Sequence, residues 1–128
     1  SDLGIQLNIT ALLTIQQVEN TVNALNSETF NIISVFAGRI ADTGIDPKKI
    51  MKNSKDIISS NLLKTELLWA SPRQVLNILE AEDVGCDIIT ITPELLNKTS
   101  NFGKNLDQLS LETVKMFYDD ALKAGYTL

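Results

Sequence analysis

Four short apolar segments, each followed by a stretch with helical spacing of its apolar residues, constrain the fold of this chain most. They span residues 5–13, 31–37, 65–70 and 86–92. Short apolar strands that alternate with amphipathic helices are typical of βαβ units, in which parallel strands are joined by crossover helices. The order therefore predicts an α/β fold with a parallel sheet, followed by a C-terminal helix.

Local signals indicate where the helices begin. Capping boxes are predicted at Thr14–Gln17 and Ser71–Gln74 from the spacing of their residues. A cap residue precedes a proline at 46–47, 71–72 and 92–93, and proline is favoured at the first position of a helix. The apolar spacing predicts the buried helical residues: Val18, Val22 and Leu25, then Ile50, Ile57 and Ile58, then Val75, Leu76 and Leu79, and in a closing helix after Ser110 Val114, Phe117, Ala121 and Leu122.

The first and fourth strand segments carry apolar residues on one face and polar residues on the other. In the first, Asn8 and Thr10 alternate with Leu7 and Ile9. Parallel strands covered by helices on both faces usually read as continuous apolar runs. The polar face therefore favours the wall of a closed barrel over a doubly wound sheet, which stays the alternative.

Four βα units are half of the eight that close a (β/α)8 TIM barrel, which typically takes about 250 residues. We therefore interpret residues 1–128 as a single, partial domain. An isolated half would expose two strand edges and one sheet face, which favours pairing with another chain. The expected partners are further copies in a homo-oligomer, or the other half of the barrel.

Composition excludes several classes of function. Sixteen acidic residues outnumber eleven basic ones and no basic run occurs, so no nucleic-acid partner is expected. No apolar run approaches the length of a membrane span, so no membrane partner is expected and the protein should be soluble. The chain has no histidine and one cysteine, Cys86, which leaves no disulfide, histidine-based triad or usual zinc set. A cytoplasmic protein without metal or cofactor is predicted.

The only two arginines follow strand segments, where barrels bind their ligands. Arg39 comes directly after Gly38, whose missing side chain lets the backbone or a ligand come close. Arg73 is expected in the first turn of the third helix, whose N-terminus already favours an anion. Because a guanidinium matches phosphate with paired donors, the two arginines predict a sugar-phosphate site.

Each of these residues also has a purely structural interpretation. Arg39 could pair with Asp42 or Asp46, and Arg73 could be solvated on a helix surface. The polar residues of the first strand could be core groups that bond to neighbouring strands. Three further residues could serve only for packing: Phe36, Trp69 and Cys86.

Four motifs occur in an order and spacing that resemble a known family. They are IQLNITALLT (5–14), SVFAGRIADTG (34–44), WASPRQV (69–75) and GCDIITITPELL (85–96). Together they resemble the second half of transaldolases and of their fructose-6-phosphate-aldolase relatives, over essentially the whole chain. The resemblance implies the C-terminal half of a TIM barrel, and transfer of a dihydroxyacetone unit between sugar phosphates through a Schiff base, as in the pentose phosphate pathway.

The resemblance also implies roles for individual residues. Thr10 would position the catalytic water. Substrate would be bound by Asn8 and Ser34, which contact the sugar, by Phe36, which shapes the pocket, and by Arg39, Ser71 and Arg73, which hold the phosphate.

The chain departs from the family pattern at two points. Val35 stands where many members have proline, which alters the pocket wall. The family's Schiff-base lysine lies on the fourth barrel strand, before the part that this chain resembles, and residues 1–4 would be the tail of the preceding helix. None of the nine lysines lies at the reactive end of an apolar strand, and Lys64 precedes its strand. The complete protein is therefore expected to be an enzyme and this chain alone inactive. The alternatives are a self-associating structural fragment and a non-catalytic sugar-phosphate-binding module.

Overall fold

The computed structural model describes residues 4–61 and 64–125 of the 128-residue chain. The chain divides into two compact units, Ser1–Leu96 and Asn97–Leu128, and each is described by itself. The first unit contains the sheet and the candidate site. The second contains the C-terminal helix.

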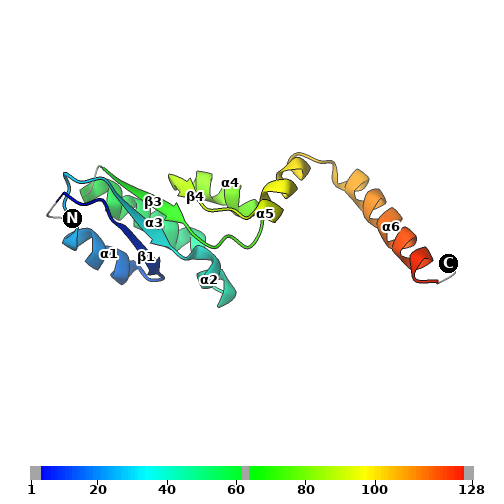
Figure 1. The fold of residues 1–128 in the computed structure, drawn as a ribbon, viewed down its shortest axis with the longest axis horizontal. Coiled ribbons are helices and arrows are strands. Elements are labelled where there is room, and N and C mark those ends of the chain that lie inside the picture. Colours follow the sequence, from blue (N-terminus) through cyan, green and yellow to red (C-terminus); the bar gives the residue numbers. More distant parts are fainter. Residues whose placement is uncertain (1–3, 62–63, 126–128) are drawn as a thin grey trace. The chain divides into compact units, whose positions relative to one another are not determined.

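A single parallel sheet of four strands forms the centre of the first unit (Figure 1). Its strands lie in chain order: β1 (Asn8–Leu12), β2 (Asn31–Val35), β3 (Thr65–Trp69) and β4 (Ile88–Ile89). Strands that alternate with helices confirm the predicted α/β class. β4 is shorter than the predicted strand over 86–92, because Thr92 turns to cap the helix that begins at Pro93.

Six α-helices and one 3-10 turn connect and follow the strands within the described residues. They are α1 (Ile15–Ala24), α2 (Ala37–Asp42), α3 (Pro47–Asn61), α4 (Leu76–Asp83), α5 (Pro93–Lys98), the turn η1 (Thr99–Asn101) and α6 (Leu106–Lys123). The capping box predicted at Thr14–Gln17 is present in full at the start of α1. At the start of α3 the Asp46 carboxylate accepts the Lys48 N–H at 3.0 Å, which confirms that start as well.

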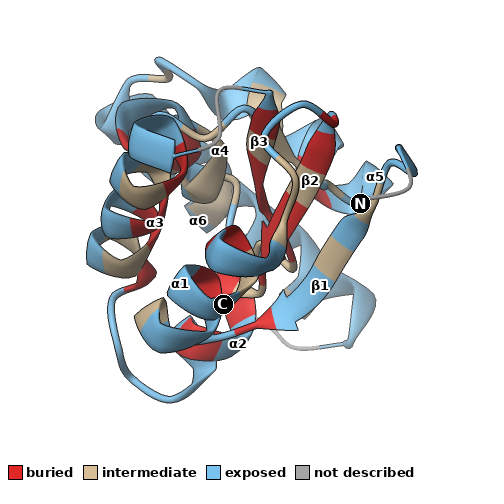
Figure 2. Cartoon of the chain, turned by 90° about the vertical axis from the view of Figure 1, so that its left-hand side faces the viewer, coloured by how far each residue is buried: buried red, intermediate tan, exposed pale blue. Residues whose placement is uncertain are grey.

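The hydrophobic core lies between the helices and one face of the sheet. Buried residues gather where α1 and α3 face β2 and β3 (Figure 2). Predicted helical core residues that are buried include Val18, Val22 and Ile58. Odd-numbered strand residues meet them there: Ile33 and Val35 from β2, and Leu67 and Trp69 from β3. The packing interpretation of Trp69 is therefore confirmed.

The other face of β1 is polar, as the alternation predicts. Asn8 and Thr10 are exposed, whereas Ile9 packs against the core. Helices that cover one face of a parallel sheet and leave polar strand residues on the other are expected in a barrel wall. The sheet therefore fits half of an eight-stranded barrel.

The predicted capping box at Ser71–Gln74 is wrong. α4 begins only at Leu76, and Ser71 has a positive φ of 58°, which no helix start of this kind adopts. The Asn77 side chain instead folds back and accepts the N–H groups of Arg73 and Gln74, at 2.8 and 2.9 Å. Arg73 therefore lies in an irregular connection before α4 and not in its first turn.

The predicted burial of residues in the helix after β3, which is α4, is also wrong in part. Leu76 and Leu79 are 52% and 46% exposed, whereas Ala81 and Val84 belong to the core. Successive helical residues are rotated by about 100°, so a stripe that contains Ala81 and Val84 turns Leu76 and Leu79 outward. The predicted stripe of leucines therefore lies on a different side of the helix from the residues that reach the core.

The segment after β2 contains a short helix that the sequence did not predict. The strand ends at Val35, and a short helix, α2, begins at Ala37. Gly38 and Arg39 follow the strand, as predicted, and lie in this helix.

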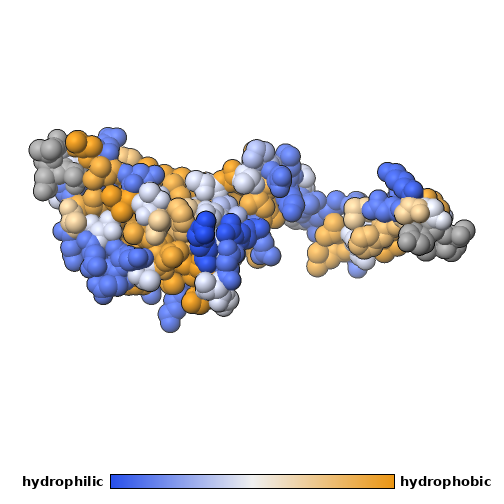
Figure 3. All heavy atoms as spheres, turned by 60° about the horizontal axis from the view of Figure 1, so that its bottom comes forward, coloured by the Kyte–Doolittle hydropathy of each residue, from blue (hydrophilic) through white to orange (hydrophobic). Residues whose placement is uncertain are grey.

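The second unit consists mainly of α6, which begins at Leu106 and not after Ser110. Asn105 caps it, because its side chain accepts the N–H groups of Asp107 and Gln108. Within the described residues no residue of α6 is buried, so the predicted burial of Val114 and Phe117 does not occur in this chain. Hydrophobic side chains gather along its surface (Figure 3). No helix in the described ranges combines the length and apolar character that crossing a bilayer requires.

Candidate functional site

The carboxyl ends of the strands meet at one edge of the sheet. The first residue after each of three strands donates its N–H to the end of the neighbouring strand: Phe36 to Leu12 at 2.9 Å, Ala70 to Val35 at 2.9 Å and Thr90 to Trp69 at 3.2 Å. In parallel α/β sheets and barrels, ligands bind at this edge. Most of the predicted site residues lie at or near it.

Two predicted sugar-contacting residues are joined directly. The Ser34 hydroxyl of β2 donates a hydrogen bond to Asn8 Oδ1 of β1 at 2.7 Å. Ser34 is 3% exposed, so its hydroxyl is held in one place, whereas Asn8 is exposed. The bond leaves the Asn8 amide N–H groups on the polar face of the sheet, where they could donate to a ligand.

Thr10 lies at an irregularity in β1. The register with β2 shifts between Ile9 and Leu12, and Ala11 has a positive φ of 62°. A left-handed conformation costs a residue with a Cβ about 1–2 kcal/mol, and bulges commonly re-aim side chains next to functional sites. The bulge lets Leu12 reach the core while Thr10 stays exposed.

Gly38 is required by a close backbone approach. Its N–H donates to Ala70 at 3.3 Å, and a Cβ placed on Gly38 would overlap the Ser71 carbonyl oxygen and lie 2.6 Å from the Ser71 carbonyl carbon. Of the two sequence interpretations, backbone or ligand, the backbone accounts for this glycine. The contact seats α2 against the connection that carries Ser71 and Arg73.

An ion pair joins α2 to the same connection. Arg73 donates from Nε to Asp42 Oδ1 at 3.1 Å and from Nη2 to Asp42 Oδ2 at 2.7 Å. Both side chains are about half exposed, at 45% and 53%. Among the described residues Arg39 makes no ion pair, and Asp46 pairs with Lys48 instead. The proposed partners of Arg39 are thus engaged elsewhere, and Arg73 is not simply solvated.

Charge is stabilised on both members of this pair. The hydrogen bonds from Arg73 hold the pKa of the Asp42 carboxyl below its usual range, and the positive charge of Arg39 acts in the same direction. The hydrogen bond to Asp42 in turn raises the pKa of Arg73. The cluster of Arg39, Asp42 and Arg73 therefore keeps one net positive charge at neutral pH.

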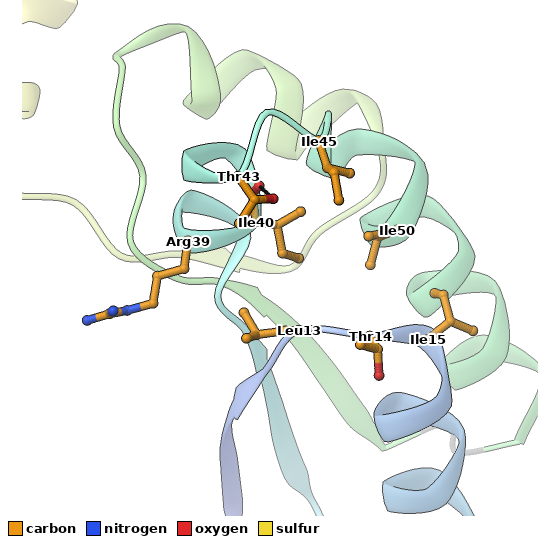
Figure 4. Close-up of a pocket in the computed structure, with 8 residues that line it drawn as sticks. All are labelled: Leu13, Thr14, Ile15, Arg39, Ile40, Thr43, Ile45 and Ile50. Atoms are coloured by element: carbon orange, nitrogen blue, oxygen red, sulfur yellow. Dashed lines mark hydrogen bonds between the residues drawn. The ribbon is translucent and has the colours of Figure 1, made fainter.

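Two cavities adjoin this edge. A cavity of about 300 Å³ is lined by Ser71, Pro72, Arg73, Thr90, Ile91 and Thr92, and so brings two predicted phosphate ligands together with threonine side chains. A second, of about 320 Å³, is almost entirely apolar and is lined by Leu13, Thr14, Ile15, Arg39, Ile40, Thr43, Ile45 and Ile50. The Arg39 guanidinium points away from its aliphatic lining (Figure 4). Arg39 is therefore exposed at the edge of the sheet. Phe36, three residues earlier, is the partly buried N-cap of the same helix, α2.

The other reactive side chains do not form a second centre. Burial, with the nearby Asp87 carboxylate, raises the pKa of Cys86 to about 12, so this thiol stays protonated at neutral pH. Lys64 precedes β3 and donates to the Glu28 carbonyl oxygen at 3.3 Å, at the amino end of the sheet. No lysine lies on a strand in the part of the chain that the structure describes, and the same part contains no group of three potential metal ligands.

Comparison with known proteins agrees with this geometry. The family model for Transaldolase/Fructose-6-phosphate aldolase matches residues 1–128. The chain belongs to this family. A probable transaldolase of Nitrosopumilus maritimus is 33% identical over 77% of the chain and 43% of the relative's length, and a probable transaldolase 2 of Listeria monocytogenes is 35% identical over 74% and 42%. A probable transaldolase of Methanococcus vannielii is 28% identical over 94% of the chain and 53% of its own length.

This transaldolase-family chain spans about half the length of the curated relatives that it matches. The parallel sheet of four strands accounts for half of the eight strands of a barrel.

Sequence reasoning misses the groups that organise the site. It points to Asp42 only as a partner of Arg39, and it does not single out Asn77. Asp87 is missed too: it binds Lys55 at 2.8 Å and accepts the Leu67 N–H at 2.9 Å, and so ties α3 and β3 together just before β4. An aspartate or asparagine beside a strand or helix end is the signal that could find them, because such side chains satisfy free backbone N–H groups.

Proposed function

We propose that this chain supplies the sugar- and phosphate-binding part of a transaldolase, which transfers a dihydroxyacetone unit between sugar phosphates through a Schiff base. The observation that carries the proposal is the common edge of the sheet. The Ser71–Arg73 cavity and Arg39 lie at this edge, and the Asn8–Ser34 pair lies on the polar face of the sheet that leads to it, in a chain of the transaldolase family.

Individual roles follow from the chemistry of these groups. Asn8 and Ser34 present amide and hydroxyl groups suited to sugar hydroxyls, and Phe36 provides a wall. Arg39, Ser71 and Arg73 suit the phosphate, because guanidinium and hydroxyl donors match its oxygens. Thr10, aimed by the bulge at Ala11, holds the water that is released as the imine forms and that is added back when the imine is hydrolysed.

The nucleophile is assigned to a part of the protein outside this chain. In Schiff-base catalysis a lysine amine condenses with the ketose carbonyl and releases water, and the protonated imine accepts electrons as the C–C bond breaks. Such a lysine needs a lowered pKa and a position facing the substrate. Lys64, the lysine next to a strand, pairs with Glu28 at the opposite edge, so it does not meet these requirements.

We further propose that residues 1–128 form one part of a barrel domain. β1 and β4 are the outer strands of the sheet and each has one neighbour, so both offer a backbone edge for pairing. The rest of the complete protein, or a further copy in a homo-oligomer, would supply the strands that close it.

Borohydride trapping tests the proposed function. Incubation with fructose 6-phosphate and sodium borohydride should leave this chain unmodified by intact-mass measurement, whereas the complete protein should gain one reduced sugar adduct on a lysine outside this chain. Complementing this chain with the separately produced remainder should restore the adduct. An adduct on this chain alone would refute the placement of the nucleophile, and no adduct on the complete protein would refute the Schiff-base function.

A further inference from the structure

We propose that Asp42 positions Arg73 for anion binding, by holding one edge of its guanidinium so that the other edge faces the end of the sheet. The inference deepens the proposed function, on which it rests for the identity of the anion as a sugar phosphate. Asp42 would not touch the substrate and would act only through Arg73.

The two hydrogen bonds show which edge is occupied. Asp42 accepts from Nε and from one terminal nitrogen of Arg73, in a paired arrangement with distances of 3.1 and 2.7 Å. The other terminal nitrogen and the second N–H of the bound one remain as donors. These donors lie along one planar edge and match two oxygens of a phosphate. One guanidinium can therefore bind Asp42 and a phosphate at the same time.

Arg73 needs such a partner because its local structure does not hold the side chain. The residue follows Pro72 in an irregular connection, and its backbone N–H donates to the Asn77 side chain. An arginine side chain that is fixed loses about 2 kcal/mol of rotamer entropy. Asp42 supplies the constraint before the anion arrives, so binding no longer has to order the side chain.

The constraint is effective because α2 is itself seated on the connection. Gly38, in the first turn of α2, contacts the Ser71 backbone, and Asp42 ends the same short helix. The helix also carries Arg39, so one backbone element sets the positions of both arginines relative to the Ser71 turn. This arrangement places Asp42 within hydrogen-bonding distance of Arg73.

A charge effect and a positioning effect predict opposite changes in phosphate affinity when the Asp42 carboxylate is removed. Removal of a negative charge near two arginines would strengthen anion binding if only Coulomb attraction mattered. If Asp42 positions Arg73, the same change weakens binding, because the guanidinium is no longer held. The sign of the change in affinity therefore decides between the two.

The test measures binding of inorganic phosphate to this chain by isothermal titration calorimetry and by NMR titration of the arginine Nε–H resonances. Asp42→Asn is expected to weaken phosphate binding about twofold to fivefold, the range that an exposed ion pair supports, and to shift the Arg73 Nε–H resonance in the free chain. Asp42→Glu should recover part of the affinity. Asp46→Asn is the matched control, since it removes an equal charge from an exposed aspartate that pairs with Lys48, and should leave affinity unchanged.

A double variant excludes a general structural effect of the Asp42 substitution. Arg73→Lys keeps the positive charge but cannot bind two groups in one plane. Adding Asp42→Asn to Arg73→Lys should therefore cause no further loss of phosphate affinity. Unchanged or tighter phosphate binding by Asp42→Asn overturns the proposal, and so does a wild-type chain that binds no phosphate.

The outcome is separate from that of the proposed function. A complete protein that forms no borohydride adduct, while phosphate binding still depends on Asp42, would refute the Schiff-base function and support the positioning role. An adduct in the complete protein together with phosphate binding that is indifferent to Asp42 would do the reverse.

Discussion

Replacement of Gly38 by alanine tests whether the close approach of α2 to the Ser71 turn organises this end of the sheet. Alanine favours a helix over glycine by about 1 kcal/mol, so propensity alone predicts a more stable protein. The structure predicts the opposite. The added Cβ would overlap the Ser71 carbonyl oxygen, and the neighbouring Ser71 carbonyl carbon would lie 2.6 Å away.

The expected loss follows from three contributions. Overpacking typically costs about 1–3 kcal/mol, and the upper end applies because the obstacle is backbone and not a flexible side chain. The hydrogen bond from Gly38 N–H to Ala70, already 3.3 Å long, would be lost at about 1 kcal/mol. Set against the gain in helix propensity, the net loss in the free energy of unfolding is about 3 kcal/mol.

Urea unfolding followed by circular dichroism measures this loss. Gly44→Ala is the control: Gly44 has a φ of +84°, and a methyl group added there would meet no atom within 4 Å. Its cost is therefore the left-handed conformation alone, about 1–2 kcal/mol. Phosphate binding should weaken in Gly38→Ala and stay unchanged in Gly44→Ala. A Gly38→Ala variant as stable as the wild type, or more stable, would refute the reasoning.

Two further predictions concern the structure behind the site. Asp87→Ala should lower the free energy of unfolding by about 1–2 kcal/mol in urea, because the Leu67 N–H and Lys55 lose their acceptor, whereas the exposed Asp56→Ala should have little effect. The pKa of Cys86, raised in the folded state from 9.0 to about 12, predicts stability that is fully present below pH 9 and lost as pH rises through this interval. Between pH 8 and pH 11 the free energy of unfolding should fall by less in Cys86→Ala than in the wild type, as measured by urea unfolding curves. An equal loss in both proteins would assign the effect to other groups.

Local features of this chain were predictable because their causes lie within a few residues. The Thr14–Gln17 capping box needs only the spacing of two side chains, and it forms as expected. The polar alternation of Asn8 and Thr10 follows from the two-residue repeat of a strand. The Ser71–Gln74 box has the same spacing and fails, because Ser71 is drawn into a positive φ where its carbonyl meets Gly38, more than thirty residues earlier in the chain.

The sequence by itself determined the α/β order, the one-sided core, the family and the position of both arginines after strands. The tertiary structure alone decided that Arg39 lies on a short helix, that Gly38 makes room for backbone, and that Asp42 binds Arg73 across 31 positions of sequence. The physical reason is the range of the forces involved. Propensity and capping act along the chain, whereas close packing and ion pairing depend on which distant segments the sheet brings to the same edge.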